Sequence, residues 1–158
     1  MKQLGLRLAE KKDCRLLWKW RNEESVRKFA FKTRFIPYEE HKKWFDEKLK
    51  NPNTQILILL NGGKEVGQIR FDVDAKRVAE IDISIDKDER GKGYGTKGLQ
   101  IVCKYGFKNF KIEKIISHIK KNNEVSLTTF IKVGFISNGL RKFKSYQCYE
   151  MSLYKGKT

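Results

Sequence analysis

The sequence predicts a single α+β domain built on a mixed β-sheet. Three observations support this prediction: several short segments alternate polar and apolar residues, two longer segments carry apolar residues at helical spacing, and no internal repeat or low-complexity tract marks a linker. A chain of 158 residues is long enough to bury a core of its own. We therefore expect residues 1–158 to form one domain with about seven strands and about four helices.

The boundaries of the elements follow from periodicity and from capping residues. Pro37 opens a helix with an acidic first turn and a basic last turn, and Asn123 and Gly134 are typical caps of another helix. Asp13 is expected to cap the first helix with its side chain. The expected helices run from Asp13 to a bend within 21–24, and over 37–50, 94–110 and 123–133. The expected strands cover residues 3–8, 55–60, 66–73, 78–86, 112–119, 135–136 and 149–154, with a basic loop over 141–144.

The strand over residues 78–86 has one polar and one apolar face. Glu80, Asp82 and Ser84 alternate with three isoleucines, and side chains two residues apart in a strand point to the same face. Three oxygen-bearing side chains are therefore expected to lie together on one side of the sheet.

Composition excludes several functional classes. Hydrophobic residues make up 39% of the chain and no apolar run approaches the length of a membrane span, so we expect a cytoplasmic protein without membrane partners. Three scattered cysteines and two histidines predict neither a disulfide framework nor a metal site, and Cys103 is expected to be a core residue. The net charge of +16 favours an anionic partner, although lysines spread along the chain also suit an ordinary solvated surface.

A glycine-rich loop, Arg90-Gly91-Lys92-Gly93-Tyr94-Gly95, lies between a predicted strand and a predicted helix. Glycines allow the backbone to approach a phosphate, and unpaired N–H groups at a helix start attract anions. The loop fits neither a Walker motif nor a Rossmann fingerprint, because the required glycine spacings are absent. Phosphate binding and simple capping both remain open for this loop.

The loop resembles the signature of the GNAT superfamily of N-acetyltransferases, Arg/Gln-x-x-Gly-x-Gly/Ala, through Arg90, Gly93 and Gly95. The segments 123–126 and 132–135 resemble a second family motif, and the order of the expected elements agrees along essentially the whole chain. The resemblance implies the GNAT fold, with a mixed and mostly antiparallel sheet, and acetyl-CoA as the acetyl donor.

The resemblance also implies which residues hold the cofactor. Backbone N–H groups of the glycine loop would bind the pyrophosphate, with added charge from Lys92 and Lys97, and a splayed strand before the loop would bind pantetheine. Asn123 would contact the other side of the cofactor, and its reading as a plain helix cap is equally compatible. The implied cofactor residues are Ile83, Ser84, Ile85, Arg90, Gly91, Lys92, Gly93, Tyr94, Gly95, Thr96 and Asn123.

The implied catalytic groups are few. Glu80 matches a family carboxylate that accepts the amine proton, although it could also be an ordinary solvent-facing residue paired with lysine. The family commonly places a proton-donating tyrosine where this chain has Phe130. Either Tyr146 or Tyr149 would then protonate the leaving thiolate, or solvent would do so. We name Glu80 and Tyr146 as the catalytic candidates.

The stretches 17–22 and 36–45 resemble the branch that acetylates amino groups of nucleotide-linked sugars, nearest to the pseudaminic-acid pathway N-acetyltransferases. A nucleotide sugar carries a diphosphate, which basic residues attract and arginine binds well. The candidate substrate residues are Arg21, Arg34, His41 and Asp82, within a wider cluster that adds Arg27, Lys28 and Phe31. At least one of Trp18 and Trp20 is expected to pack in the core.

Two other functions remain open from the sequence. A ribosomal-protein or peptide N-terminal acetyltransferase would use the same cofactor site with an open groove for an extended backbone. A non-catalytic nucleic-acid-binding module would use the basic surface, but the chain has no recognition motif of that kind. We therefore expect a small-molecule amine acceptor, no nucleic acid, and a monomer or homodimer.

Overall fold

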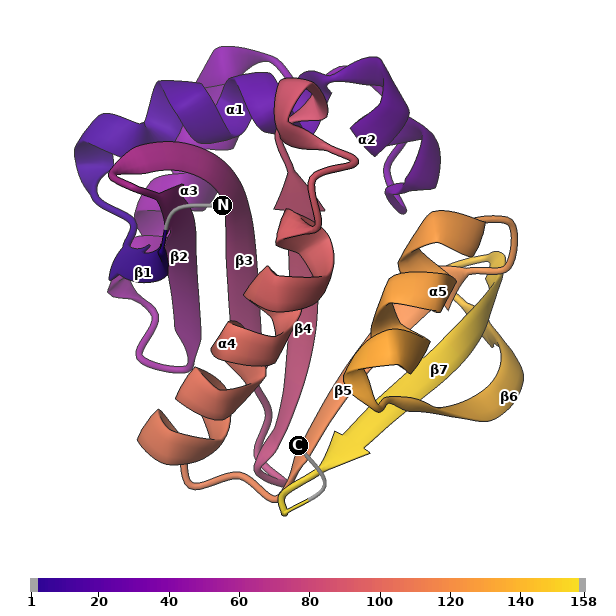
Figure 1. The fold of residues 1–158 in the computed structure, drawn as a ribbon. Coiled ribbons are helices and arrows are strands. Elements are labelled where there is room, and N and C mark those ends of the chain that lie inside the picture. Colours follow the sequence, from indigo (N-terminus) through magenta and orange to yellow (C-terminus); the bar gives the residue numbers. More distant parts are fainter. Residues whose placement is uncertain (1–2, 157–158) are drawn as a thin grey trace.

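The structure is a computed structural model that describes residues 3–156. One seven-stranded sheet with the order β1-β2-β3-β4-β5-β7-β6 forms its centre (Figure 1). Neighbouring strands are antiparallel except β4 and β5, which are parallel. The strands are β1 (Leu4–Leu8), β2 (Thr54–Asn61), β3 (Lys64–Val73), β4 (Val78–Ile85), β5 (Lys114–Lys120), β6 (Ile136–Phe143) and β7 (Tyr146–Tyr154). The predicted α+β fold with a mixed sheet is confirmed.

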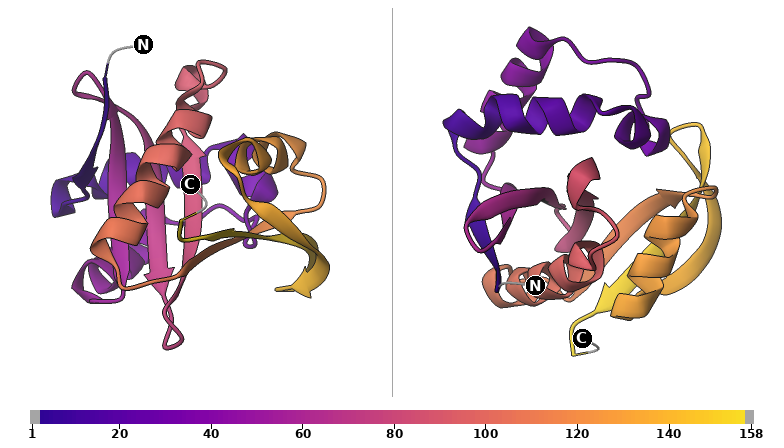
Figure 2. Two further views of the ribbon diagram at one scale, coloured as in Figure 1. Left: turned by 60° about the horizontal axis from the view of Figure 1, so that its bottom comes forward. Right: turned by 45° about the horizontal axis from the view of Figure 1, so that its top comes forward.

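Helices cover both faces of the sheet (Figure 2). The α-helices are α1 (Cys14–Asn22), α2 (Glu24–Phe29), α3 (Tyr38–Lys50), α4 (Tyr94–Asn109) and α5 (Glu124–Val133), with 3-10 turns η1 (Lys11–Asp13) and η2 (Lys87–Glu89). The sequence did not predict α2, whose six residues are too few to show a helical period and none of which is fully buried. None of the described helices is long and apolar enough to cross a membrane.

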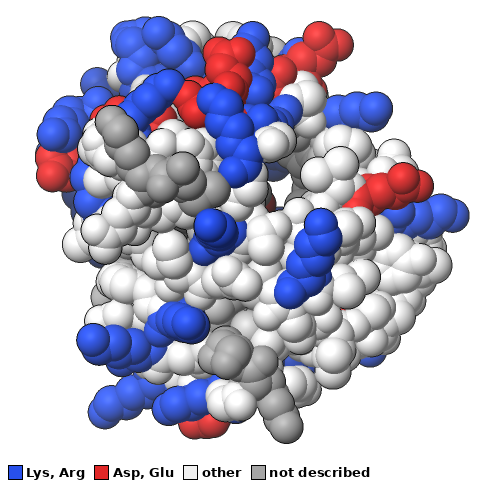
Figure 3. Space-filling view, in the orientation of Figure 1, with Lys and Arg blue, Asp and Glu red and all other residues white. Residues whose placement is uncertain are grey.

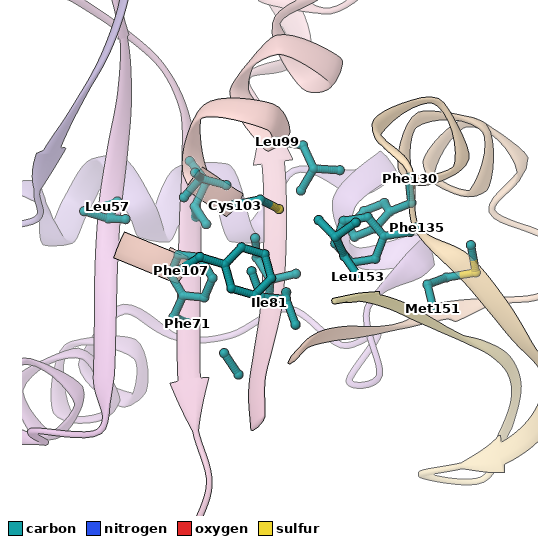
Figure 4. Close-up of a cluster of buried hydrophobic side chains, with 14 of the residues drawn as sticks. Leu57, Phe71, Ile81, Leu99, Cys103, Phe107, Phe130, Phe135, Met151 and Leu153 are labelled. Atoms are coloured by element: carbon teal, nitrogen blue, oxygen red, sulfur yellow. The ribbon is translucent and has the colours of Figure 1, made fainter. Parts of the chain in front are cut away.

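Two apolar clusters lie on opposite faces of the sheet. The larger one joins α4 and α5 to the sheet and includes Cys103, whose pKa is raised to about 12 by burial (Figure 4). This thiol is therefore an inert core group, as predicted. The smaller cluster joins α1 and α3 to β2 through Leu17, Trp20, Phe45 and Ile58. Burial of Trp20 confirms that one of the two tryptophans packs in the core.

The expected side-chain cap at Asp13 is wrong. Asp13 lies at the N-cap position of α1, but its carboxylate makes no cap hydrogen bond to that helix. It instead accepts two hydrogen bonds from the guanidinium of Arg7, at 2.7 and 2.8 Å, and one from the backbone N–H of Glu10. The carboxylate therefore pairs with a charged side chain on β1 in place of capping the helix.

The predicted basic loop over residues 141–144 is also wrong. Residues 141–143 belong to β6, and a two-residue turn at Lys144 and Ser145 connects β6 to β7. Both turn residues have positive φ, 47° and 71°, as in the type I′ turn typical of hairpins. Neither residue is glycine or asparagine, so the usual sequence signal for this turn is missing.

Candidate active site

Strands β4 and β5 pair only at one end and then diverge (Figure 1). Their pairing covers Val78 to Glu80 on β4, and the Ser117 hydroxyl donates to the Ile81 carbonyl at 3.0 Å where the strands separate. The later part of β4, including Ile83 to Ile85, pairs with β3 but has no ladder to β5. The main chain in this part of β4 therefore has a free, unpaired edge that faces the space between β4 and β5. An extended molecule can bind to such an edge like an added strand.

Helix α4 begins beside this free edge, at the end of the glycine loop. Gly93 is its N-cap residue with φ 83°, a left-handed conformation that favours glycine, and no side chain caps the helix. The first turn, formed by Tyr94, Gly95 and Thr96, therefore presents N–H groups without a capping side chain, at the positive end of the helix dipole. This arrangement suits a phosphate.

The basic side chains of the loop are already engaged with protein groups. Arg90 donates to the Ile85 carbonyl at 3.1 Å and to Ser25 at 2.6 Å. Lys92 lies 2.9 Å from a carboxylate oxygen of buried Glu89. The capacity of the loop to bind an anion therefore rests mainly on backbone N–H groups, with these cations nearby.

Asn123 is the N-cap residue of α5. Its side-chain oxygen accepts a hydrogen bond from the backbone N–H of Ser126 at 3.3 Å. The predicted capping role is confirmed, and a contact between Asn123 and a cofactor remains a prediction.

On the opposite face, beneath α1 to α3, the sheet becomes polar from β3 onward. Arg70 donates to Asp72 at 2.8 Å, and its guanidinium lies 5.5 Å from the centre of the Trp44 ring. Next to this pair, Asp82 is exposed and the side chain of Glu80 is 42% exposed. Glu80 contacts the Nδ1 atom of His118 at 3.1 Å. The two predicted carboxylates therefore share one accessible face of β4.

Helices α1 to α3 bring two arginines and a histidine together on this side of the sheet. Arg21 Nη1, Arg27 Nε and His41 Nε2 are buried and have no hydrogen-bond partner among the described residues. Burial lowers the pKa of Arg21, an effect that nearby Asp82 opposes and neighbouring arginines reinforce. The pKa of His41 is also lowered, by burial and by the charge of Arg21. We call Arg21, Arg27 and His41 the roof cluster.

Two other predicted site residues have partners of their own. Arg34 forms an exposed ion pair with Glu40 at the start of α3. The ring of Tyr146 lies under the ammonium group of Lys120, 3.6 Å from the ring centre, and 6.2 Å from the ring of Phe31. Phe130 is buried against Phe135, in the core.

Two cavities border the α1–α2 junction. A mainly apolar cavity of about 490 Å³ lies between α1 and the loop after β4, and a cavity of about 440 Å³ lies against α2, with Glu23 lining both. The space-filling view shows a hollow between the regions of α4 and α5, with lysine and arginine side chains spread over the face around it (Figure 3).

Residues 3–136 match the acetyltransferase (GNAT) domain family. The chain belongs to this family. It is an acetyl-CoA-dependent N-acetyltransferase, which excludes the non-catalytic nucleic-acid-binding alternative.

Related GNAT proteins differ in their acceptors. Spermidine N(1)-acetyltransferase of Escherichia coli is 25% identical over 85% of this chain and 73% of its own length. Acetyltransferase PseH of Campylobacter jejuni is 24% identical over 89% of this chain and 87% of its own. No single acceptor class follows from these relatives.

Solved GNAT structures share the fold at low identity. Spermidine N-acetyltransferase from Vibrio cholerae, in complex with CoA and spermine, has a TM-score of 0.89 at 19% identity, over 98% of this chain and 97% of that one. An aminoglycoside acetyltransferase in complex with coenzyme A has a TM-score of 0.87 at 18% identity, over 97% and 95%.

Residues that the sequence did not single out contact the predicted site residues. His118 and Glu150 join Glu80 across the diverging strands, and Glu23 and Ser25 bind the side chain of Arg90. These contacts depend on strands and helices that are far apart in the chain, so no local sequence signal could have found them.

Proposed function

We propose that this acetyltransferase transfers an acetyl group from acetyl-CoA to the primary amine of a nucleotide-linked amino sugar, by direct attack in a ternary complex. The observation that carries the proposal is the roof cluster, in which two arginines and a histidine keep buried nitrogen atoms without a partner. Buried polar atoms of this kind cost free energy unless a ligand or water pairs with them, and the two arginine nitrogens are donors. A diphosphate would supply acceptors with the matching charge.

The charge of the roof cluster separates the acceptor classes suggested by related proteins. Spermidine and aminoglycosides are polycations, and Arg21 and Arg27 would repel them in a partly buried site. A nucleotide-linked sugar brings negative charge instead. The chain's net charge of +16 acts in the same direction, because it attracts anions over longer distances.

The amine end of the acceptor is assigned to the carboxylate face of β4. Glu80 and Asp82 can attract the ammonium form, and Glu80 can accept its proton, directly or through water, so that the neutral amine attacks. Asp82 lies near enough to influence the pKa of Arg21. The carboxylates and the roof cluster can therefore contact opposite ends of one acceptor molecule.

The residues around the diverging strands fit acetyl-CoA. The uncapped first turn of α4 suits the pyrophosphate, and the free edge of β4 at Ile83, Ser84 and Ile85 suits the amides of pantetheine. The cofactor supplies the acetyl group as a thioester. This chain's part is to hold it in place and bring the amine close to it, which can account for much of the rate enhancement.

Protonation of the leaving thiolate has no assigned residue. Tyr146 remains our candidate, with Tyr149 and solvent as alternatives, since a thiol with a pKa near 8.5 needs little assistance. A cytoplasmic location and a monomeric or homodimeric state also remain predictions from the sequence.

The experiment is thiol release from acetyl-CoA with UDP-amino sugars, dTDP-amino sugars, spermidine, kanamycin and N-terminal peptides. We expect turnover with a nucleotide-linked amino sugar, and a KM for that acceptor raised about 10-fold or more in Arg21→Met, because a charged hydrogen bond contributes about 1.5–3 kcal/mol. Arg15→Met is the matched control, since Arg15 is an exposed arginine on the same helix and has no assigned role in the site. Turnover of spermidine or kanamycin alone would contradict the proposed acceptor class.

A further inference from the structure

His118 on β5 lies between two carboxylates from different strands. Its Nδ1 atom is 3.1 Å from Glu80 on β4, and its Nε2 atom is 3.8 Å from Glu150 on β7. The side chain of His118 is only 11% exposed, whereas that of Glu80 is 42% exposed. The imidazole is therefore the buried neighbour of an accessible carboxylate.

The ring of His118 is fixed in its orientation. It stacks on Phe143 of β6, with ring centres 3.8 Å apart and planes 1° from parallel. On the far side, Arg141 of β6 forms an ion pair with Glu150 at 3.0 Å, which holds the second carboxylate in place. Four strands thus contribute to one chain of contacts, Arg141 to Glu150 to His118 to Glu80.

Within residues 3–156, neither of the two neighbouring cations, Lys120 and Arg70, hydrogen-bonds to Glu80. Lys120, two residues farther along β5, directs its ammonium group to the Tyr146 ring and to the Lys28 carbonyl. Arg70 on β3 hydrogen-bonds to Asp72. Among the described residues, the direct hydrogen bond to the Glu80 side chain comes from His118.

We infer that His118 is the positioning residue for Glu80. Its Nδ1–H donates to the Glu80 carboxylate and aims the free oxygen of that carboxylate toward the acceptor amine. The proton removed from the amine goes to Glu80, and His118 gives up none of its own. A carboxylate that is hydrogen-bonded to a stacked imidazole ring keeps the geometry that proton transfer requires. A half-exposed glutamate without this hydrogen bond would lose that geometry. This inference rests on the proposed role of Glu80 as the base.

The test compares two amides at position 118. In His118→Asn the amide nitrogen can occupy the place of Nδ1 and still donate to Glu80, whereas in His118→Gln the longer amide reaches toward the place of Nε2. We expect kcat to stay within about 3-fold of the native value in the first variant. In the second we expect it to fall roughly 10-fold or more, with the acceptor KM and the acetyl-CoA affinity unchanged, since proton transfer by a positioned group contributes about 10²–10⁴-fold.

A double-mutant cycle separates positioning from a general structural role. If His118 acts through Glu80, His118→Gln added to Glu80→Gln produces no further loss of kcat. Equal losses in both amide variants, or a further loss in the double variant, would overturn the inference. So would native activity in Glu80→Gln.

The assay uses whichever amine of the acceptor panel the native enzyme turns over fastest. Failure of the proposed acceptor class is then distinguishable from failure of the positioning role, because the cycle can be measured with any accepted amine. Thermal unfolding of each variant confirms that the proteins compared are folded.

Discussion

Arg90 of the glycine loop binds the N-terminus of α2 through Glu23. Its Nη2 atom lies 3.3 Å from the Glu23 carboxylate, and the same carboxylate caps α2 through the backbone N–H of Ser25. The loop that is assigned to the cofactor is thereby joined to the segment that carries Arg27. The predicted cofactor loop and the roof cluster are therefore linked through α2.

Replacement of Arg90 is therefore expected to affect the acceptor more than the cofactor. In Arg90→Met we expect the acceptor KM to rise about 5-fold, corresponding to about 1 kcal/mol for a lost hydrogen bond, and the Kd of acetyl-CoA to change less. Glu23→Gln is the matched control and should raise the acceptor KM similarly. A 10-fold rise in the Kd of acetyl-CoA in Arg90→Met alone would show that the guanidinium binds the cofactor directly.

Gly93→Ala tests the role of the helix start. Alanine at φ 83° is strained by about 1 kcal/mol, and this strain falls on the helix start that is proposed to bind the pyrophosphate. Gly63→Ala is the control, because Gly63 has φ 87° in a hairpin turn with no atom near an added Cβ. Both variants should lower Tm by similar amounts, while only Gly93→Ala should weaken acetyl-CoA binding, by about 10-fold in calorimetry. Equal acetyl-CoA affinities in the two variants would contradict the assignment.

Burial of His41 predicts a loss of stability on mild acidification. The pKa of His41 in the folded protein is lowered from 6.5 by burial and by Arg21. Below about pH 6.5 the unfolded chain takes up a proton that the folded chain does not, so the free energy of unfolding falls as the pH falls. Urea unfolding at pH 7.5 and 5.5 should show a smaller decrease in His41→Phe than in the native protein. An equal decrease in both would contradict this account of His41.

The ion pair between Arg7 and Asp13 is expected to contribute to stability. The Asp13 side chain is 5% exposed and that of Arg7 25%, so Asp13→Ala leaves a partly buried guanidinium with only one carboxylate contact, the longer one to Glu65 at 3.4 Å. We expect the free energy of unfolding to fall by about 2 kcal/mol, less than for a fully buried pair. Lys12→Ala is the control, because Lys12 is exposed and its contact with Glu10 is long, at 3.6 Å. Similar urea midpoints for the two variants would contradict the expected contribution.

Most of the fold could be predicted from the sequence because local signals marked its elements. Pro37 stands at the start of α3, Asn123 and Gly134 cap α5, and alternation defined β4. Helix α2 was missed because six residues are too few to show a helical period, and the β6–β7 turn was missed because Lys144 adopts positive φ without being glycine or asparagine. Local patterns fail where tertiary contacts set the conformation.

Only those parts of the candidate site that lie within a sequence motif could be predicted from the sequence. The glycine loop and Glu80 lie on elements that the sequence defines. His118 joins Glu80 only because β4 and β5 are parallel neighbours, a pairing between segments 38 residues apart. The roof cluster likewise depends on how three separate helices, α1, α2 and α3, pack together.

The most direct measurement compares kcat/KM for two acceptors that share one amino sugar, one free and one linked to a nucleoside diphosphate. The roof cluster predicts that the nucleotide-linked form is preferred by about 100-fold or more, as expected if the diphosphate gains about two charged hydrogen bonds at about 1.5–3 kcal/mol each, and that Arg21→Met removes most of this preference. Equal kcat/KM values for the two acceptors, or a higher value for the free sugar, would contradict an anionic acceptor.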